Sequence, residues 1–313
     1  EGQADAGNID ILLRRSADHG RTWEAPRVIV DDGRDTCGNP CPILDRRTGA
    51  LLLLFCKNKG SENEDKIFSG EASPRSVWLT RSDDDGVTWS PPVEISEQVR
   101  KSGWRWYATG PGHGIQLSDG TLVAPCNHSD GPDDDWMHSH VILSEDGGAS
   151  WKIGGIEEKR TDESTVLELS DGSLYHNMRS YRGKNRRAIS HSRDKGQTWA
   201  PVTEDETLIE PVCQASVLRL STATSGGKNR VLFSNPASKK RENLTVRLSY
   251  DECKTWPVAK ALWPGPSAYS DLVVLGDRSI GCLYERGASN YRENLTFARF
   301  TLEWLTDGKD QME

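Results

Sequence analysis

One eight-residue pattern, Ser-x-Asp-x-Gly-x-Thr-Trp, occurs five times in the 313-residue chain, and we call each copy an Asp box. The third copy has Ser in place of Thr, and the fifth has Cys in place of Gly. Successive copies begin 66, 62, 48 and 57 residues apart, which leaves room for about four short strands per copy. This spacing predicts an array of similar β modules. The five copies are Ser16–Trp23, Ser82–Trp89, Ser144–Trp151, Ser192–Trp199 and Ser249–Trp256.

The residue types of the Asp box favour a structural role. An Asp in a turn accepts hydrogen bonds from backbone N–H groups a few positions on, and Gly supplies the positive φ that lets the turn close. The Thr hydroxyl can add a second local bond, and Trp has enough apolar area to be buried between neighbouring sheets. We therefore interpret the boxes, and five of the eleven Trp residues with them, as structural staples.

A second repeat lies between the boxes and consists of two apolar runs joined by a polar turn. Asp-Gly between alternating apolar runs is a strong hairpin signal. Five complete modules follow, the last of which lacks a box and ends in a strand over Leu295–Leu302. The first box has one strand, Ile9–Leu13, in front of it and no hairpin. The expected turns are Thr48-Gly49, Asp119-Gly120, Asp171-Gly172, Gly226-Gly227 and Gly276-Asp277.

Five full modules and one truncated module predict an all-β fold: a six-bladed β-propeller with five Asp-box repeats, whose first blade is incomplete at the N-terminus. We expect residues 1–313 to form a single propeller domain, because closed β arrays of this length commonly fold as one unit. A β-sandwich is the alternative fold, but it would not explain five boxes with matched hairpins.

Charge and composition exclude several classes of function. The net charge of −8 argues against a nucleic-acid partner, although a local arginine cluster is compatible with a small anionic ligand. The longest apolar stretch, Leu51–Cys56, is too short to span a membrane. Seven scattered Cys residues predict buried free thiols. We expect no metal site and no cofactor, because Cys37-x-x-x-Cys41 has no second half and the seven His residues are dispersed.

Hairpin geometry predicts that certain side chains share one rim of the fold. The residues eight before and eight after the centre of a hairpin both lie at its open end. Ligands commonly bind where such residues converge on the axis of a propeller. The residues at these positions are Glu163 and Arg179 around Asp171, Tyr269 and Glu285 around Asp277, Asn127 after Asp119, and Arg241 after the second strand of the Gly226-Gly227 hairpin.

Facing Arg, Arg, Glu and Tyr side chains favour chemistry on a substrate that carries a carboxylate. Two guanidinium forks can bind a carboxylate in bidentate fashion, which Lys could not reproduce. A Tyr beside a Glu can be deprotonated and act as a nucleophile, despite a reference pKa of about 10. A phenol suits a reacting carbon that bears a carboxylate, because an attacking Asp or Glu would be repelled. Sialidases are the glycosidases that use a Tyr nucleophile. The competing interpretation is that these residues only solvate one face of the fold.

Over essentially its whole length the chain resembles the exo-α-sialidases (neuraminidases), a family of Asp-box propeller glycosidases. The resemblance implies retaining hydrolysis of terminal α-linked sialic acids, with Tyr269 as nucleophile, Glu163 as the acceptor of its proton and Asp5 as the acid/base. Besides the boxes, the strings that carry the resemblance are Asp5–Ser16, Tyr107–Gly114, Asp162–Gly172, Asn177–Arg179, Ser234–Ser249, Leu262–Ser270 and Leu283–Gly287.

The resemblance also implies a set of binding residues. Arg179 and Arg241 are similar to the second and third of the family's carboxylate-binding arginines, and Glu285 is similar to the glutamate that buttresses the first. The candidates for contacts with the sugar substituents are Asn127, Gln214 and Tyr107, each of which could instead be a satisfied structural polar group.

The sequence departs from the family pattern at one place. Family members take their first arginine from a Phe/Tyr-Arg-Ile-Pro strand, which this sequence does not contain, and Arg14 and Arg15 lie beside a box instead. We therefore expect weak substrate binding, because Glu285 would face an anionic substrate without its arginine partner. An inactive sialic-acid-binding propeller is the alternative function, and Tyr269 with Glu163 argues for an enzyme.

Sialylated glycans are the partners expected from this interpretation, and we expect an extracytoplasmic location, whether secreted, periplasmic or lysosome-like. A glycosidase for another sugar on the same fold is disfavoured by the arginine pair, although fold alone never settles the substrate.

Overall fold

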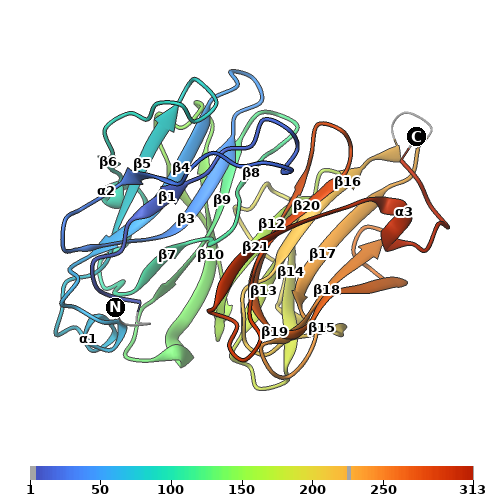
Figure 1. Ribbon diagram of the computed structural model, residues 1–313. Coiled ribbons are helices and arrows are strands. Elements are labelled where there is room, and N and C mark those ends of the chain that lie inside the picture. The colour runs from blue at the N-terminus through green and yellow to red at the C-terminus, as the bar shows by residue number, and fades with distance from the viewer. Residues whose placement is uncertain (1–4, 224–226, 313) are drawn as a thin grey trace. The chain divides into compact units, whose positions relative to one another are not determined.

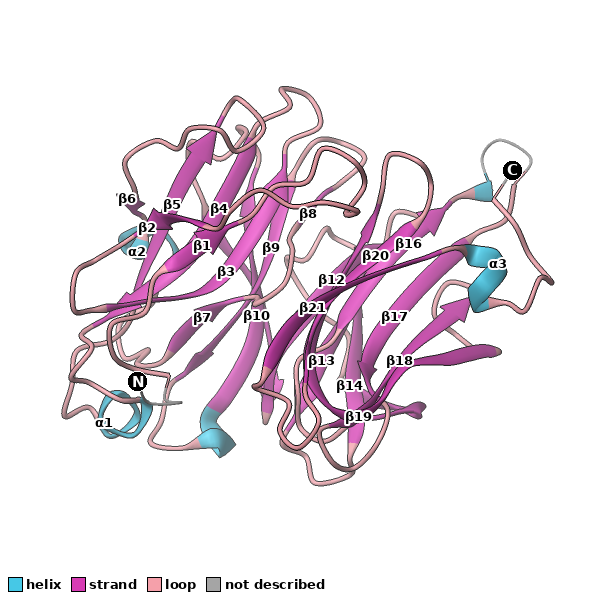
Figure 2. Ribbon diagram, viewed as in Figure 1, coloured by secondary structure: helices cyan, strands magenta, loops and turns pink. Residues whose placement is uncertain are grey.

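Antiparallel strands are the main secondary structure of the computed structural model, which describes residues 5–223 and 227–312. Figures 1 and 2 show the strands together with a few short helices. The chain divides into two compact units. The first comprises Glu1–Arg15, Glu24–Val166 and Ser192–Pro201, and the second comprises Ser16–Trp23, Leu167–His191 and Val202–Glu313.

The described strands of the first unit form sheets of two, four and five strands, each built from neighbours in the sequence. The orders are β1-β2, β3-β4-β5-β6 and β11-β10-β9-β7, with β8 also paired to β9. The strands are β1 (Ile11–Leu13), β2 (Arg27–Val30), β3 (Thr36–Leu44), β4 (Leu51–Asn58), β5 (Ser76–Ser82), β6 (Val93–Glu94), β7 (Tyr107–Thr109), β8 (Ile115–Gln116), β9 (Leu122–Ser129), β10 (Met137–Ser144) and β11 (Lys152–Lys159). Its helices are α1 (Glu64–Ser69), α2 (Ser96–Val99) and the 3-10 turn η1 (Asp134–Trp136).

The chain passes from the first unit into the second within β12 (Thr161–Glu168), which begins the sheet β12-β13-β14-β15. A six-stranded sheet, β16-β17-β18-β19-β20-β21, follows. The strands are β13 (Leu174–Ser180), β14 (Arg186–Ser192), β15 (Thr203–Ile209), β16 (Ser216–Ser221), β17 (Arg230–Pro236), β18 (Glu242–Ser249), β19 (Val258–Val274), β20 (Ile280–Arg286) and β21 (Asn294–Phe300), and the last helix is α3 (Leu302–Leu305).

Strand β19 is unusual because its 17 residues take part in two pairings. The part from Val258 to Pro266 pairs with β18, and the part from Ser267 to Val274 pairs with β20. Strand β19 therefore joins two sets of strands into one sheet.

The all-β prediction is confirmed, and consecutive antiparallel sheets of about four strands are the arrangement found in propeller blades. The expected six blades do not appear as six separate sheets. Among the described residues there are five sheets, four of which have four or more strands. The physical reason is that β19 runs unbroken from one set of strands into the next.

The same turn forms at all five Asp boxes. In the third box, Ser144 Oγ and the backbone N–H of Ser150 donate to Asp146 Oδ1 (2.8 and 2.9 Å). Ser150 Oγ donates to Asp146 Oδ2 (2.5 Å), and the N–H of Gly148 donates to Ser144 Oγ (2.8 Å). The other four boxes repeat these bonds at 2.6–3.0 Å. Each box therefore closes on its own carboxylate.

The Cys of the fifth box adopts the backbone conformation that Gly adopts in the others. Gly148 has a φ of 91°, and Cys253 is held at 65°, a left-handed value that L-residues rarely adopt. The N–H of Cys253 still donates to Ser249 Oγ (3.0 Å). The hydrogen bonds of the box therefore impose the turn even where a Cβ opposes it.

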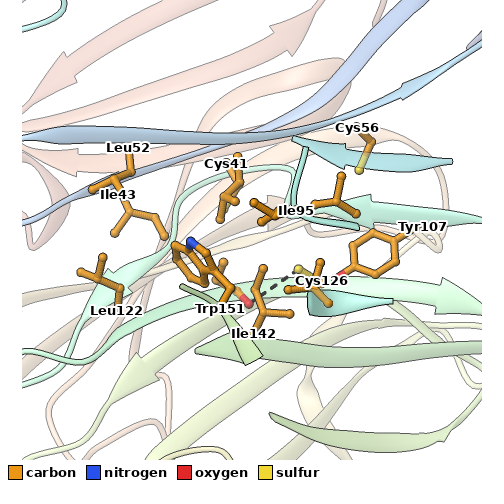
Figure 3. Packing of buried hydrophobic residues seen from close by; sticks show 14 of the residues in the cluster. Cys41, Ile43, Leu52, Cys56, Ile95, Tyr107, Leu122, Cys126, Ile142 and Trp151 are labelled. Carbon is orange, nitrogen blue, oxygen red and sulfur yellow. Dashed lines mark hydrogen bonds between the residues drawn. The ribbon is translucent and has the colours of Figure 1, made fainter. Parts of the chain in front are cut away.

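The expected burial of the box tryptophans holds for some copies only. Figure 3 shows Trp151 among side chains of β3 and β4 on one side and of β9 and β10 on the other, in one buried cluster. Trp256 is also buried. Trp23 is 38% exposed and packs edge-on against Phe297, with 5.0 Å between ring centroids. The Trp residue of a box is therefore buried only in those boxes where neighbouring sheets cover it on both sides.

The cysteines and most of the hairpin turns agree with the sequence predictions. All seven Cys residues are buried free thiols, as expected. Gly49, Gly120 and Gly172 have positive φ in their predicted turns, whereas Arg278 takes that conformation in the turn predicted at Gly276-Asp277. Gly226 lies outside the described residues. Within the described ranges, no helix has the length and apolar character needed to cross a membrane.

We predict that the protein loses stability as the pH falls from about 4 to about 2. The Ser150 hydroxyl lowers the pKa of Asp146 to about 2, and the Thr88 hydroxyl lowers the pKa of Asp84 to about 2. A carboxyl whose pKa is lower in the folded state contributes stability above its unfolded pKa of about 3.9, and loses that contribution as the pH falls through the folded value. Thermal unfolding followed by circular dichroism across this range measures the effect.

Replacing Asp146 with Asn tests the box as the source of this stability. Losing a charge-assisted hydrogen bond should lower Tm at neutral pH by about 2–4 °C and weaken its dependence on acid. The control is Glu145→Gln, because Glu145 is exposed and pairs with Lys152 only at the surface. Equal changes in Tm for the two variants would contradict the role given to the box.

Candidate active site

Four predicted site residues are brought together in the second unit. Arg179 lies near the end of β13, and Arg241 directly precedes β18. Tyr269 lies in β19 and Glu285 lies in β20. All four side chains are partly exposed. The strands that carry them can be followed in Figure 1.

Tyr269 is the centre of this group. Arg179 Nη1 donates to the Tyr269 hydroxyl oxygen (3.3 Å), and the guanidinium carbon of Arg241 lies 5.7 Å from the centroid of the Tyr269 ring. The backbone N–H of Tyr269 donates to Glu285 Oε2 (3.2 Å). A guanidinium donor at a phenol oxygen stabilises negative charge on that oxygen. The four residues that the sequence analysis grouped at one rim therefore also lie close together within the second unit.

Two further tyrosines accompany the arginines, and sequence reasoning missed both. Arg179 Nη2 donates to the Tyr181 hydroxyl (2.6 Å), and Arg241 Nη1 donates to the Tyr291 hydroxyl (3.4 Å). The spacing Arg179-x-Tyr181 could have suggested the first, because residues two apart near a strand end lie on one side. Tyr291 lies in the loop between β20 and β21, and no sequence pattern marks it.

Arg241 is a cation without a carboxylate partner among the described residues. Its guanidinium donates to the neutral oxygens of Tyr291 and of the Val212 backbone (both 3.4 Å). Burial lowers the pKa of Arg241, but the neighbouring ionisable Cys213 and Tyr269 outweigh this and leave the pKa above its ordinary value. The group is therefore a permanent positive charge, suited to an anionic ligand.

Gln214 fixes the backbone beside Tyr269. Its side chain is buried, Oε1 accepts from the N–H of Ser270 (3.0 Å), and Nε2 donates to the carbonyl of Ser270 (3.1 Å). The amide thus acts as a clamp on the residue that follows Tyr269. Its predicted contact with the sugar stays a prediction.

Two candidates for sugar contacts, Tyr107 and Asn127, are fully buried in the first unit. The Tyr107 hydroxyl lies 3.0 Å from His140 Nε2, and burial raises the pKa of Tyr107 well above its usual value. Neither amide atom of Asn127 has a hydrogen-bond partner within the described part of the chain. Tyr107 therefore has a structural partner, whereas Asn127 has unused hydrogen-bonding capacity.

The two remaining catalytic candidates also belong to the first unit. Glu163 is buried in β12, and Asp5 is exposed near the start of the described chain. Burial lowers the pKa of Arg75, and Asp5 is among the acidic groups whose charge opposes that shift. Asp5 therefore acts electrostatically on a buried cation, and the catalytic roles of Asp5 and Glu163 stay predictions.

No group of three or more His, Cys, Asp or Glu side chains within residues 5–223 and 227–312 could hold a metal ion.

Comparison with known proteins defines the class of this chain. Residues 1–283 match the BNR repeat-like domain family. The sialidase of Bacteroides fragilis is 33% identical over 305 residues, which cover 90% of this chain and 55% of that protein. The exo-alpha-sialidase of Aspergillus fumigatus is 31% identical and is matched over 97% of this chain and 79% of its own length. The chain therefore belongs to the sialidase family of BNR-repeat proteins.

A solved structure agrees with this assignment. The Hadza microbial sialidase Hz136 superimposes with a TM-score of 0.84 at 33% identity, over 95% of this chain and 60% of that chain. The chain spans about half the length of the first curated relatives that it matches, 55% and 47%.

We predict that Asn127→Leu stabilises the protein. A buried amide with neither atom bonded costs about 1–3 kcal/mol, so an apolar side chain of similar size should raise Tm by about 2–4 °C. Thermal unfolding followed by circular dichroism measures the effect.

Asn177→Leu is the matched control, because Asn177 is equally buried but both ends of its amide are bonded, to Arg187 and Tyr175. This variant should lower Tm. A Tm for Asn127→Leu that falls as far as that of Asn177→Leu would show that Asn127 has partners in solution.

Proposed function

We propose that the chain is an exo-α-sialidase that removes terminal α-linked sialic acids from glycoconjugates with retention of configuration. The observation that carries the proposal is the position of Tyr269, which is hydrogen-bonded to Arg179 and flanked by Arg241. Family membership supports the same activity. Sialylated glycans are the proposed substrates.

The two arginines supply the binding step. The carboxylate of sialic acid is carried on its anomeric carbon, so groups that hold the carboxylate also place the reacting carbon. Arg241 offers a fixed positive charge without a protein carboxylate among the described residues, and its guanidinium lies beside the Tyr269 ring. Arg179 offers a second guanidinium, which is hydrogen-bonded to the Tyr269 hydroxyl. Planar forks bind a carboxylate more specifically than ammonium groups.

Tyr269 is the proposed nucleophile. Glu163 accepts the phenol proton while the phenol oxygen forms a bond to the anomeric carbon and the glycosidic bond breaks. Asp5 protonates the leaving oxygen and then removes a proton from the water that releases the glycosyl-enzyme intermediate. The Arg179 donor favours the charge on the Tyr269 oxygen, and two displacements at one carbon give net retention.

We also propose that the fold is a six-bladed propeller whose first blade is the two-stranded sheet β1-β2. Counting β19 once with β16–β18 and once with β20–β21 gives six sets of strands. In this description Glu285 lies in the last blade, where its bond to the backbone of Tyr269 steadies the nucleophile.

A sialic-acid-binding propeller without catalysis is the alternative function. Binding of sialic acid requires the arginines, but it gives no role to a tyrosine hydroxyl that is hydrogen-bonded to a guanidinium. A fluorogenic α-sialoside assay beside a calorimetric titration with sialic acid separates the two functions, since a binding protein would give heat without turnover.

We predict that Tyr269→Phe lowers kcat on the fluorogenic sialoside by about three orders of magnitude or more, because the attacking oxygen is removed. Proton NMR of the first product formed by the unmodified protein should show the α-anomer, as retention requires.

Tyr250→Phe is the control for Tyr269→Phe, because the Tyr250 hydroxyl bonds Asp310 and plays no part in the proposed site. This variant should keep its kcat. Near-normal turnover by Tyr269→Phe would refute the nucleophile assignment.

A further inference from the structure

An ion pair between Arg187 and Glu210 lies in the interior of the second unit, and both side chains are 0% exposed. Arg187 Nη1 lies 2.7 Å from Glu210 Oε2. Removing two charges from water is costly, and the attraction between the two ions often does no more than offset that cost. The other contacts of the pair indicate what it contributes instead.

The pair holds the strand that carries Arg179. Glu210 Oε1 accepts a hydrogen bond from the N–H of Ser180 (2.8 Å), the last residue of β13. Arg187 Nε donates to Asn177 Oδ1 (2.6 Å) on the same strand. One bond lies one residue after Arg179 and the other lies two residues before it. Strand β13 is therefore fixed on both sides of this arginine.

The pair also holds the loop segment Glu210–Gln214, which we call the hub segment. The carbonyl of Cys213 accepts from Arg187 Nη1 (2.5 Å), and the N–H of Cys213 donates to Glu210 Oε2 (3.3 Å). Burial raises the pKa of Glu210, while Arg187 and the backbone donors oppose that rise. Both polar backbone groups of one residue are thus fixed by the two charges.

The hub segment contacts the rest of the candidate site. Val212 is held at a φ of 55°, an uncommon value for a β-branched residue, and its carbonyl accepts from Arg241 Nη2 (3.4 Å). Gln214 makes both of its clamp bonds to Ser270, the residue after Tyr269. Through these residues and β13, the buried pair is connected to both arginines and to the nucleophile.

We propose that Arg187 and Glu210 form a positioning pair, which keeps Arg179 and Arg241 at the separation that one substrate carboxylate requires. This inference rests on the proposed function, in which the two arginines share that carboxylate. An apolar pair could fill the volume but could not bond the backbone of β13 or of the hub segment. Such support matters because displacing a binding group by about 1 Å can cost two orders of magnitude in rate.

The test compares variants in steady-state hydrolysis of the fluorogenic sialoside and in thermal unfolding. Glu210→Gln should raise KM about tenfold while kcat changes less than about threefold, because the arginines shift but the backbone of Tyr269 keeps its bond to Glu285, which lies outside the hub segment. The matched control is Asp310→Asn, which disrupts the buried Arg230–Asp310 pair of the same unit (2.7 Å). The control should lower Tm and leave KM unchanged.

The double variant R187M/E210M separates positioning from stability. Replacing a buried ion pair by apolar side chains of similar volume removes the cost of burying two charges, but here it also leaves the backbone groups of Ser180 and Cys213 without their partners. The Tm of this variant should therefore fall no further than that of Asp310→Asn. Its KM should still be about tenfold higher than that of the unmodified protein. This variant decides the question if Glu210→Gln does not fold. An unchanged KM in the double variant, or the same rise in KM for Asp310→Asn, overturns the proposal.

Failure of the proposed function is recognised separately. If the unmodified protein does not hydrolyse the sialoside, that function fails, and calorimetric titration with free sialic acid replaces KM as the measurement. R187M/E210M should then bind about tenfold more weakly than Asp310→Asn. Equal affinities of these two variants, or no binding by the unmodified protein, overturn the positioning role.

Discussion

Each Asp box is closed by a carboxylate that accepts hydrogen bonds from the hydroxyl and backbone groups of its own turn, and the rest of the structure depends on this local closure. The bonds are made within eight residues, so they do not require distant parts of the chain to meet first. They are strong enough to hold Cys253 in a conformation normally left to Gly. The strands on either side of a box can differ widely in sequence, because the turn is held by hydrogen bonds among the residues of the box itself.

The sequence was sufficient for features that rest on local chemistry. Turn geometry predicted the hairpins at Gly49, Gly120 and Gly172, and equal offsets from two hairpin centres predicted that Tyr269 and Arg179 meet. Tertiary contacts could not be predicted from the sequence. The depth of Tyr107 depends on which sheets cover it, and the Arg187–Glu210 pair joins β14 to a loop 23 residues away without any repeating pattern. The six-blade count rested on counting hairpins, which gives no sign that one strand serves two sets.

Two cations of the second unit, Arg187 and Arg241, differ in how their charge is used. Arg187 is paired with the Glu210 carboxylate and also donates to the Cys213 carbonyl and to Asn177, so its charge is used within the fold. Arg241 has neutral acceptors only among the described residues, so its charge remains available to a ligand. A protein with a net charge of −8 can thus offer a cationic contact to an anion, because a local group dominates the potential over a few ångströms.

The continuity of β19 has a consequence for how this fold can evolve. In a strand, a slip of one residue moves every side chain to the opposite face. Because the two halves of β19 pair with different partners, a single inserted or deleted residue near Pro266 would shift the register of one half relative to the other. It would also turn the Tyr269 phenol away from the guanidinium that contacts it. Length changes should therefore accumulate in the loops around this strand, and its 17 residues should be inherited as a block of fixed length.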